Sequence, residues 1–155
     1  MKNLNLIKES KVIYGSWKAS RIILDYHNSC KASFKGEMTL SKMDETKKAS
    51  AIDKPKITRI KFEEEGTLTY NNKTFKTYKF HFIDIRRNQI NILFENKKTF
   101  FKINKIDASQ KISHKCNNDI YNGWIRFLNK RSFFICWNVF GPRKNYYLKA
   151  IYKKN

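Results

Sequence analysis

Apolar and polar residues alternate along most of the chain, so that an apolar side chain is usually followed by a polar one. The segment 30–38 shows this clearly, with small or apolar residues at one set of positions and charged or hydroxyl-bearing residues at the other. A period of two predicts a β-strand with one buried face. We expect strands at residues 11–25, 30–38, 57–63, 67–70, 74–83, 89–95, 99–105, 109–116, 119–127, 132–140 and 145–153.

Turn-forming residues separate these segments. Asn71-Asn72 suits a tight hairpin because asparagine tolerates left-handed backbone conformations, and Gly15 marks a bend or bulge in the first strand. Glu65-Gly66 predicts a break between two strands. The polar segment 41–56 predicts the longest surface loop, and residues 2–10 allow a short helical turn.

No helical period extends over residues 11–155. Many short strands in sequence, joined by simple hairpins, predict an all-β protein. We expect a single domain over residues 1–155, with its core at about 11–153. An up-and-down antiparallel barrel of about eight to ten strands is favoured over a sandwich, because closure removes exposed sheet edges.

The chain has 155 residues and a formal net charge of +20, with 33 Lys and Arg against 13 Asp and Glu. Such a charge is typical of polyanion-binding proteins. The excess is mostly lysine, however, and it is dispersed along the chain together with abundant Asn and Ile, as a coding bias would produce. The charge therefore indicates a solvated basic surface more than a dedicated nucleic-acid site.

Three cysteines, without a CxxC pair, argue against a disulfide framework and for a reducing compartment. The N-terminal segment lacks the apolar run of a signal peptide, and no stretch of apolar residues is long enough for a transmembrane helix. We therefore expect a cytoplasmic protein.

Five short motifs occur in order along the chain. They are Gly15-x-Trp17-x-x-x-Arg21, Phe62-x-Glu64-x-Gly66, Tyr78-x-Phe80, His114-x-Cys116-x-x-Asp119-x-Tyr121-x-Gly123 and Trp137-x-Val139-x-Gly141-Pro142-x-Lys144-x-Tyr146. Together they resemble a small lipocalin-like family of unknown function, DUF6314, over about residues 14–152. The resemblance implies a calycin-type barrel and no known reaction.

The chain departs from the family pattern at two positions, with Lys76 where the family has arginine and Asn145 where it has aspartate. A role that needs a bidentate arginine or a carboxylate there is not expected. The resemblance to lipocalin-like barrels also implies that Trp17 packs under a basic residue, Arg143 or Lys144. We expect structural roles for Gly15, Trp17, Gly66, Asp119, Gly141 and Pro142, with Asp119 capping a turn.

His114 and Cys116 are two residues apart and share a strand face, so with Cys136 or His81 they could assemble a soft-metal site. No second pair with ligand spacing supports this, and cysteine packs in cores as a small apolar residue. A catalytic Cys-His pair has no third group to orient the histidine. The sequence therefore predicts no metal, no cofactor and no catalytic residue.

A set of polar and aromatic residues spread over several strands is more informative. If these side chains point inward, they would place a few donors and acceptors inside apolar walls, as in small-molecule pockets. A buried hydrogen-bond network that only satisfies itself is the competing interpretation. The cavity candidates are Arg21, Glu64, Tyr78, His114, Tyr121, Trp137, Lys144 and Tyr146.

The sequence thus favours a barrel that binds a small organic ligand, with an anionic ligand favoured by the basic charge. One alternative is an RNA-associated or nucleoprotein-associated module that uses basic patches and exposed aromatics. Another is an enzyme that acts on a bound ligand through His114 and Tyr121. A binding protein is favoured over an enzyme.

Overall fold

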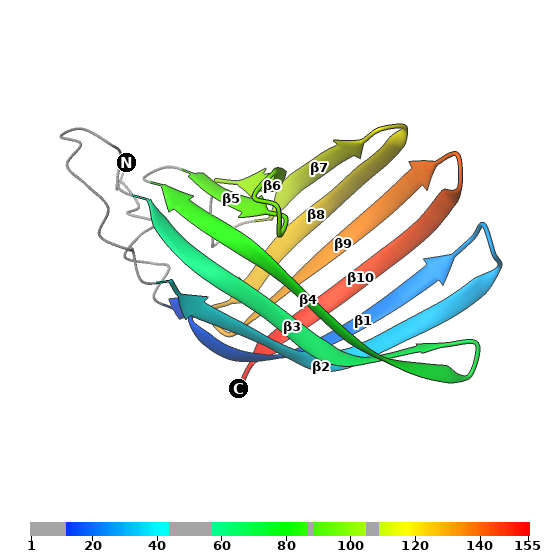
Figure 1. Cartoon of the computed structure of the whole chain (residues 1–155), viewed down its shortest axis with the longest axis horizontal. Helices are drawn as coiled ribbons and strands as arrows, with labels where there is room; N and C mark the ends of the chain where they lie inside the picture. Colours follow the sequence, from blue (N-terminus) through cyan, green and yellow to red (C-terminus); the bar gives the residue numbers. More distant parts are fainter. Residues whose placement is uncertain (1–11, 44–56, 87–88, 105–108) are drawn as a thin grey trace.

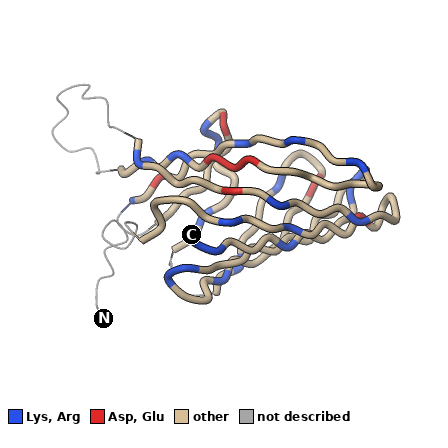
Figure 2. Tube along the Cα trace, turned by 90° about the horizontal axis from the view of Figure 1, so that it is seen from below, with Lys and Arg blue, Asp and Glu red and all other residues tan. Residues whose placement is uncertain are grey.

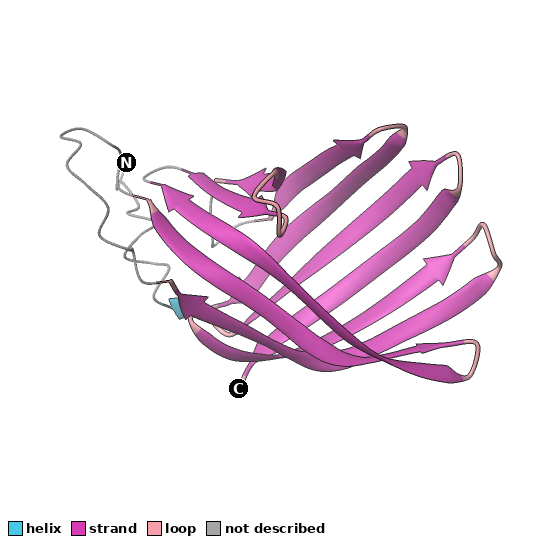
Figure 3. Ribbon diagram, viewed as in Figure 1, coloured by secondary structure: helices cyan, strands magenta, loops and turns pink. Residues whose placement is uncertain are grey.

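The computed structural model describes residues 12–43, 57–86, 89–104 and 109–155. Ten antiparallel strands form one sheet, and hardly any helix accompanies them in this part of the chain (Figure 3). The strands are β1 (Gly15–Asp25), β2 (Cys30–Lys42), β3 (Thr58–Tyr70), β4 (Lys73–Arg86), β5 (Gln89–Leu93), β6 (Thr99–Ile103), β7 (Gln110–Cys116), β8 (Asp119–Asn129), β9 (Ser132–Gly141) and β10 (Lys144–Lys154).

The strand order is β6-β5-β4-β3-β2-β1-β10-β9-β8-β7, so each strand pairs with its neighbours in sequence and β1 pairs with β10. Figure 1 shows the sheet curling until β6 and β7 lie side by side. There Phe100 of β6 packs its ring 5.1 Å from that of His114 of β7, and the Asn104 amide donates to the Gln110 Oε1 at 2.7 Å. The result is the nearly closed all-β barrel that the sequence predicted.

Strand β5 is much shorter than β4 and pairs only with its second half, Phe82–Arg86. In the described registers, the first half of β4 therefore has a strand partner only on the β3 side. Figure 1 shows this half extending beyond the β5–β6 hairpin. The barrel wall is thus interrupted between the start of β4 and the end of β7.

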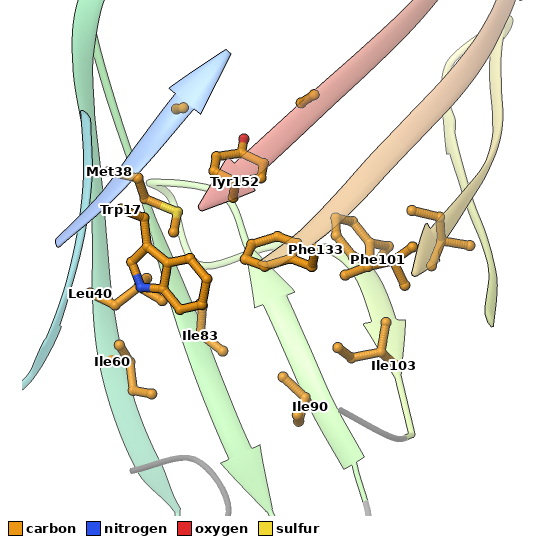
Figure 4. Packing of buried hydrophobic residues seen from close by; sticks show 14 of the residues in the cluster. Trp17, Met38, Leu40, Ile60, Ile83, Ile90, Phe101, Ile103, Phe133 and Tyr152 are labelled. Carbon is orange, nitrogen blue, oxygen red and sulfur yellow. The ribbon is translucent and has the colours of Figure 1, made fainter. Parts of the chain in front are cut away.

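Apolar side chains from all around the barrel meet in its interior (Figure 4). Trp17 lies edge-on to Phe133 at 5.3 Å between ring centroids, and Phe133 stacks on Tyr152 at 4.7 Å. Trp17, Met38 and Ile60 are almost completely buried. The inward positions of 30–38 and the shared face of Gly15, Trp17, Ala19 and Arg21 follow the predicted alternation.

The predicted break at Glu65-Gly66 is wrong, because β3 runs unbroken through it. Gly66 pairs with Gly36 on β2, and the Phe34 ring covers both. A Cβ at Gly66 would collide with the Lys35 carbonyl oxygen and with the Phe34 ring. The glycine therefore serves a close approach between two strands rather than a turn.

Other local predictions have mixed outcomes. Asn71 and Asn72 both have positive φ, as predicted, and Gly15 has φ +110°. Trp17 does lie under a basic residue of the last strand, but this is Lys154, whose Nζ is 5.7 Å from the ring centroid. The predictions for 2–10 and for most of 41–56 lie outside the described residues, although β2 extends into the latter segment as far as Lys42.

Candidate ligand-binding site

A cavity of about 290 Å³ lies inside the barrel. Its walls are mainly apolar and include two stacked rings, Phe100 and Trp137, whose centroids are 5.4 Å apart. Six side chains with polar groups also line it: Arg21, Lys79, His81, Tyr121, Tyr146 and Tyr152. Apolar walls with a few convergent polar groups are the usual composition of small-molecule sites, whose volumes begin at roughly 300 Å³.

An ionic cluster sits midway along the barrel. The Arg21 Nη2 donates to both oxygens of Glu64, at 2.7 and 2.9 Å, and lies 3.2 Å from the Tyr152 hydroxyl. The Tyr152 hydroxyl donates to Glu64 Oε2 at 3.1 Å. Only 2% of the Glu64 side chain is exposed, and 12% of that of Arg21. Glu64 is one of the predicted cavity candidates, and the alternation of β3 turns its side chain inward.

Lys79 of β4 completes the cluster, with its Nζ 3.1 Å from Glu64 Oε1. Two cations therefore share one carboxylate, which leaves a formal excess of one positive charge. Arg21 and Lys79 line the cavity, whereas Glu64 lies behind them and is not part of the lining. The charge that this cluster presents to the cavity is therefore positive.

Burial and neighbouring charges set the protonation of the cluster. Burial opposes the ionisation of Glu64, but the charges of Lys79 and Arg21 hold the pKa of its carboxyl below the usual value. Burial, assisted by the charge of Arg21, lowers the pKa of the Lys79 ammonium. The Lys79 side chain borders the cavity but is 43% exposed, so solvent reaches it as well.

His81 lies on the same face of β4 as Lys79. Burial and then the Lys79 charge lower the pKa of its ring to about 4, so the ring is neutral at physiological pH. Its Nδ1 is 3.2 Å from the Leu93 carbonyl oxygen, which can only accept, so Nδ1 carries the proton. The Nε2 atom of His81 is thus an acceptor, and the ring also packs edge-on against Phe62.

A second polar group lies nearer the end of the barrel where the β9–β10 turn is. The Lys144 Nζ is 2.7 Å from Asp119 Oδ2 and donates to the Tyr121 hydroxyl at 3.1 Å. These two hydrogen bonds raise the pKa of Lys144. Burial and the adjacent Tyr121 raise the pKa of Tyr146 to about 12, so Tyr146 keeps its proton at neutral pH.

A surface hollow adjoins the cavity where the barrel wall is interrupted. It is lined by residues of β4 and of the β5–β6 turn, among them Tyr78, Phe94 and Asn96. Lys79 and His81 line both the hollow and the cavity. The charged cluster is therefore adjacent to a route from solvent.

The structure brings together five of the predicted cavity candidates: Arg21, Tyr121, Trp137 and Tyr146 line the cavity, and Glu64 supports it from behind. Lys144 is not part of the described cavity lining, but it donates a hydrogen bond to the hydroxyl of Tyr121, which is.

Tyr78 and His114 lie elsewhere. The Tyr78 side chain is exposed on the outer face and donates to Glu63 at 2.8 Å, which corrects its predicted inward position. His114 packs among the rings of Phe94, Phe100 and Tyr121 at the β6–β7 junction and is not part of the described cavity lining.

Three polar residues of the cavity lining were missed from the sequence, namely Lys79, His81 and Tyr152. The choice of Tyr78 as a cavity candidate placed the opposite face of β4 in the interior. Lys79 and His81 share their face with Ile83 and Ile85, and that apolar continuation is the signal that could have identified the inner face of β4.

Asp119, Gly141 and Pro142, for which the sequence predicted structural roles, lie close together around the β9–β10 connection. Asp119 forms an ion pair with Lys144 and packs against Gly141, at which a Cβ would collide with the Asp119 carboxylate. Pro142 and Arg143 form the short connection between β9 and β10. In the described part of the chain, no group of three or more His, Cys, Asp or Glu side chains is placed to hold a metal ion. Nor does a helix long and apolar enough to cross a membrane occur there.

The model of the family of unknown function DUF6314 matches residues 13–154. The chain belongs to this family. The match spans almost all of the barrel, so the ten strands and the cavity of this DUF6314 member lie within the family region. A search of curated proteins finds no match.

Solved structures share the fold of this DUF6314 chain. An S-type phycobiliprotein lyase from Guillardia theta is similar with a TM-score of 0.58 at 10% identity, over 98% of this chain and 93% of that one. A protein of unknown function from the DUF3598 family of Nostoc punctiforme is similar with a TM-score of 0.56 at 5% identity, over 94% of this chain. This chain spans about half of the latter, 48%. At these identities the likeness concerns the fold, which is lipocalin-like.

Proposed function

We propose that this barrel binds a small amphipathic organic acid, with the apolar body of the ligand in the cavity and its acid group at Arg21 and Lys79. The observation that carries the proposal is the arrangement of the cluster. Two cations face the cavity, and the one carboxylate between them does not. A ligand carboxylate would balance the excess charge through charge-assisted hydrogen bonds in a largely apolar surrounding.

The cavity walls support a ligand with a mainly hydrocarbon or aromatic body. The lining includes Phe62, Ile135 and Leu148 besides the stacked pair of Phe100 and Trp137. Such walls favour apolar groups by removing them from water, at roughly 25 cal/mol per Å² of surface. The hydroxyls of Tyr121 and Tyr146 offer further hydrogen bonds near the rim.

The surface hollow beside β4 supports access of such a ligand, because Lys79 lines both the hollow and the cavity. The acid group would meet this cation before the apolar body is fully enclosed. The similarity in fold to an S-type phycobiliprotein lyase is consistent with a barrel interior that binds a small molecule.

The proposal is tested by isothermal titration calorimetry with a matched pair of ligands, a long-chain carboxylic acid and the primary alcohol of equal length. A charge-assisted hydrogen bond contributes roughly 1.5–3 kcal/mol, so we expect the acid to bind at least about tenfold more tightly. In Lys79→Met this preference should fall sharply. Lys76→Met, which removes an exposed lysine three positions earlier on β4, is the matched control and should leave it unchanged.

Equal binding of acid and alcohol would show that the cluster is a self-contained structural network. The same conclusion would follow if Lys79→Met kept the full preference for the acid. Binding of neither ligand, together with an unchanged fold by circular dichroism, would contradict the proposal altogether.

A further inference from the structure

The outer surface of β7, β8, β9, β10 and β1, here called the basic face, has an unusual composition. Its outward-facing positions include no Asp or Glu. They include six exposed cations: Lys18, Lys111, Lys115, Arg126, Lys149 and Lys153. A coding bias that adds lysine everywhere does not by itself keep Asp and Glu from these outward-facing positions. The two carboxylates of these strands, Asp25 and Asp119, stand at strand ends on the opposite set of alternating positions.

The outward-facing acidic residues of the described strands lie on β2, β3 and β4. One of them, Glu37, stands opposite Lys18 at the edge of the basic face in the β1–β2 register. Glu63 and Glu65 face outward on β3, and Asp84 and Glu37 lie on the outer side of β4 and β2. Figure 2 shows a red run on one strand in the upper part of that view, whereas the coloured segments on the strands in the lower part are mostly blue. The barrel is therefore electrostatically two-sided.

Large apolar side chains are exposed on the same basic face. Trp124 and Phe140 are 44% and 54% exposed, and three aliphatic side chains, Ile22, Ile120 and Leu128, are exposed to a similar degree. They come from three different strands, β1, β8 and β9, and Ile120 stands directly opposite Phe140 in the β8–β9 register. Half of the ten large apolar side chains that are exposed in the described part of the chain therefore lie on this face.

The cations lie between these apolar groups. The Lys111 Nζ is 5.5 Å from the Trp124 ring centroid, and the Lys149 Nζ is 5.0 Å from that of Phe134. Lys149 also pairs with Ile22 in the β10–β1 register. The face thus offers apolar side chains with lysine ammonium groups beside them, and none of the outward-facing positions of these strands carries a carboxylate.

We propose that the basic face docks on an anionic phospholipid surface. Trp, Phe and aliphatic side chains partition into the headgroup region of a bilayer, and nearby lysines are attracted to anionic lipids with about 1 kcal/mol each. The composition favours this partner over single-stranded nucleic acid, because three of the five exposed apolar side chains are aliphatic and cannot stack on bases. This inference is independent of the ligand proposed for the cavity.

Trp124 provides a direct spectroscopic test with the full chain. The other two tryptophans, Trp17 and Trp137, are buried, so Trp124 should dominate any change caused by a partner. On titration with vesicles of phosphatidylcholine that contain about 30% phosphatidylserine, we expect a blue shift of its emission and reduced quenching by acrylamide. Pure phosphatidylcholine vesicles should produce little change, and the Trp124→Phe variant should lose the optical signal.

Co-sedimentation with the same vesicles tests the charge argument. Each lysine removed from the basic face, as in Lys111→Gln or Lys149→Gln, should weaken vesicle binding about fivefold, the equivalent of about 1 kcal/mol. Lys76→Gln on the outer side of β4 is the matched control and should not change it. Because these lysines are exposed, the variants should fold normally, which circular dichroism would verify.

Three results would overturn the inference. The first is no binding to anionic vesicles. The second is equal sensitivity to Lys76→Gln and Lys149→Gln, which would indicate attraction by net charge alone. The third is a change in Trp124 emission on adding single-stranded RNA but not on adding vesicles, which would assign the face to a nucleic acid.

Discussion

Replacing Glu64 with glutamine removes one negative charge from the centre of the barrel and nearly preserves the shape of the side chain. Glu64 is almost completely buried and accepts hydrogen bonds from Arg21 and Tyr152, and the Lys79 ammonium lies 3.1 Å away. After the substitution, two cations would remain together without a counter-charge. Removing one partner of a buried ion pair typically costs about 3–5 kcal/mol.

We therefore expect Glu64→Gln to lower the free energy of unfolding by about 3 kcal/mol or more. For a chain of this size, 1 kcal/mol corresponds to roughly 2–4 °C, so the midpoint of thermal unfolding should fall by roughly 6–12 °C. Urea denaturation followed by tryptophan fluorescence would measure the difference. Glu63→Gln is the matched control, because the neighbouring Glu63 is partly exposed and its pairs with Lys61 and Tyr78 are screened by solvent, so its loss should matter far less.

The pH dependence gives a second readout. The pKa of Glu64 is lower in the folded protein than its usual value of 4.5. Its contribution is therefore fully present above the pKa of the unfolded chain and is lost as the pH falls through the folded pKa. The wild-type protein should lose stability below about pH 4.5 more steeply than Glu64→Gln, which lacks this group.

A loss below about 1 kcal/mol in Glu64→Gln would refute the reasoning, as would a loss equal to that in Glu63→Gln. Either result would mean that water or a rearranged Lys79 compensates the missing charge. The positive interior on which the proposed acid site depends would then be in error.

Two further predictions concern single residues. Gly66→Ala should lower the free energy of unfolding by about 1–3 kcal/mol in urea denaturation, because the added Cβ collides with the Lys35 carbonyl and the Phe34 ring; a change within about 0.5 kcal/mol would contradict the assigned packing. Because burial lowers the pKa of Lys79, the affinity for a carboxylic acid should begin to fall at a pH below that at which an ordinary lysine titrates; calorimetry should show no such fall in Lys79→Met.

Local alternation was sufficient to predict most of the fold. It identified the strands, and it placed Arg21 and Glu64 on inner faces although they lie 43 positions apart. Asn71-Asn72 and Gly15 were predictable because their backbone conformations depend mainly on their own residue types.

The remaining features depend on contacts between distant strands. The local apolar continuation at Ile83 and Ile85 could identify the inner face of β4, but the sharing of Glu64 by Lys79 and Arg21 depends on three strands and no local pattern shows it. The role of Gly66 depends on Gly36 in the facing strand, and the partner of Trp17 depends on the β1–β10 register, which brings Lys154 opposite to it. Strand β5 is too short to pair with the first half of β4, which interrupts the barrel wall. This feature likewise appears only in the assembled sheet.

Native mass spectrometry of the full chain, purified without refolding, would detect the proposed ligand itself. We expect a stoichiometric small molecule with an acid group, either retained from the cell or acquired on incubation with a long-chain carboxylic acid, and lost in Lys79→Met. A wild-type protein that stays bare under both conditions, while its circular dichroism shows an intact β-fold, would contradict the proposal.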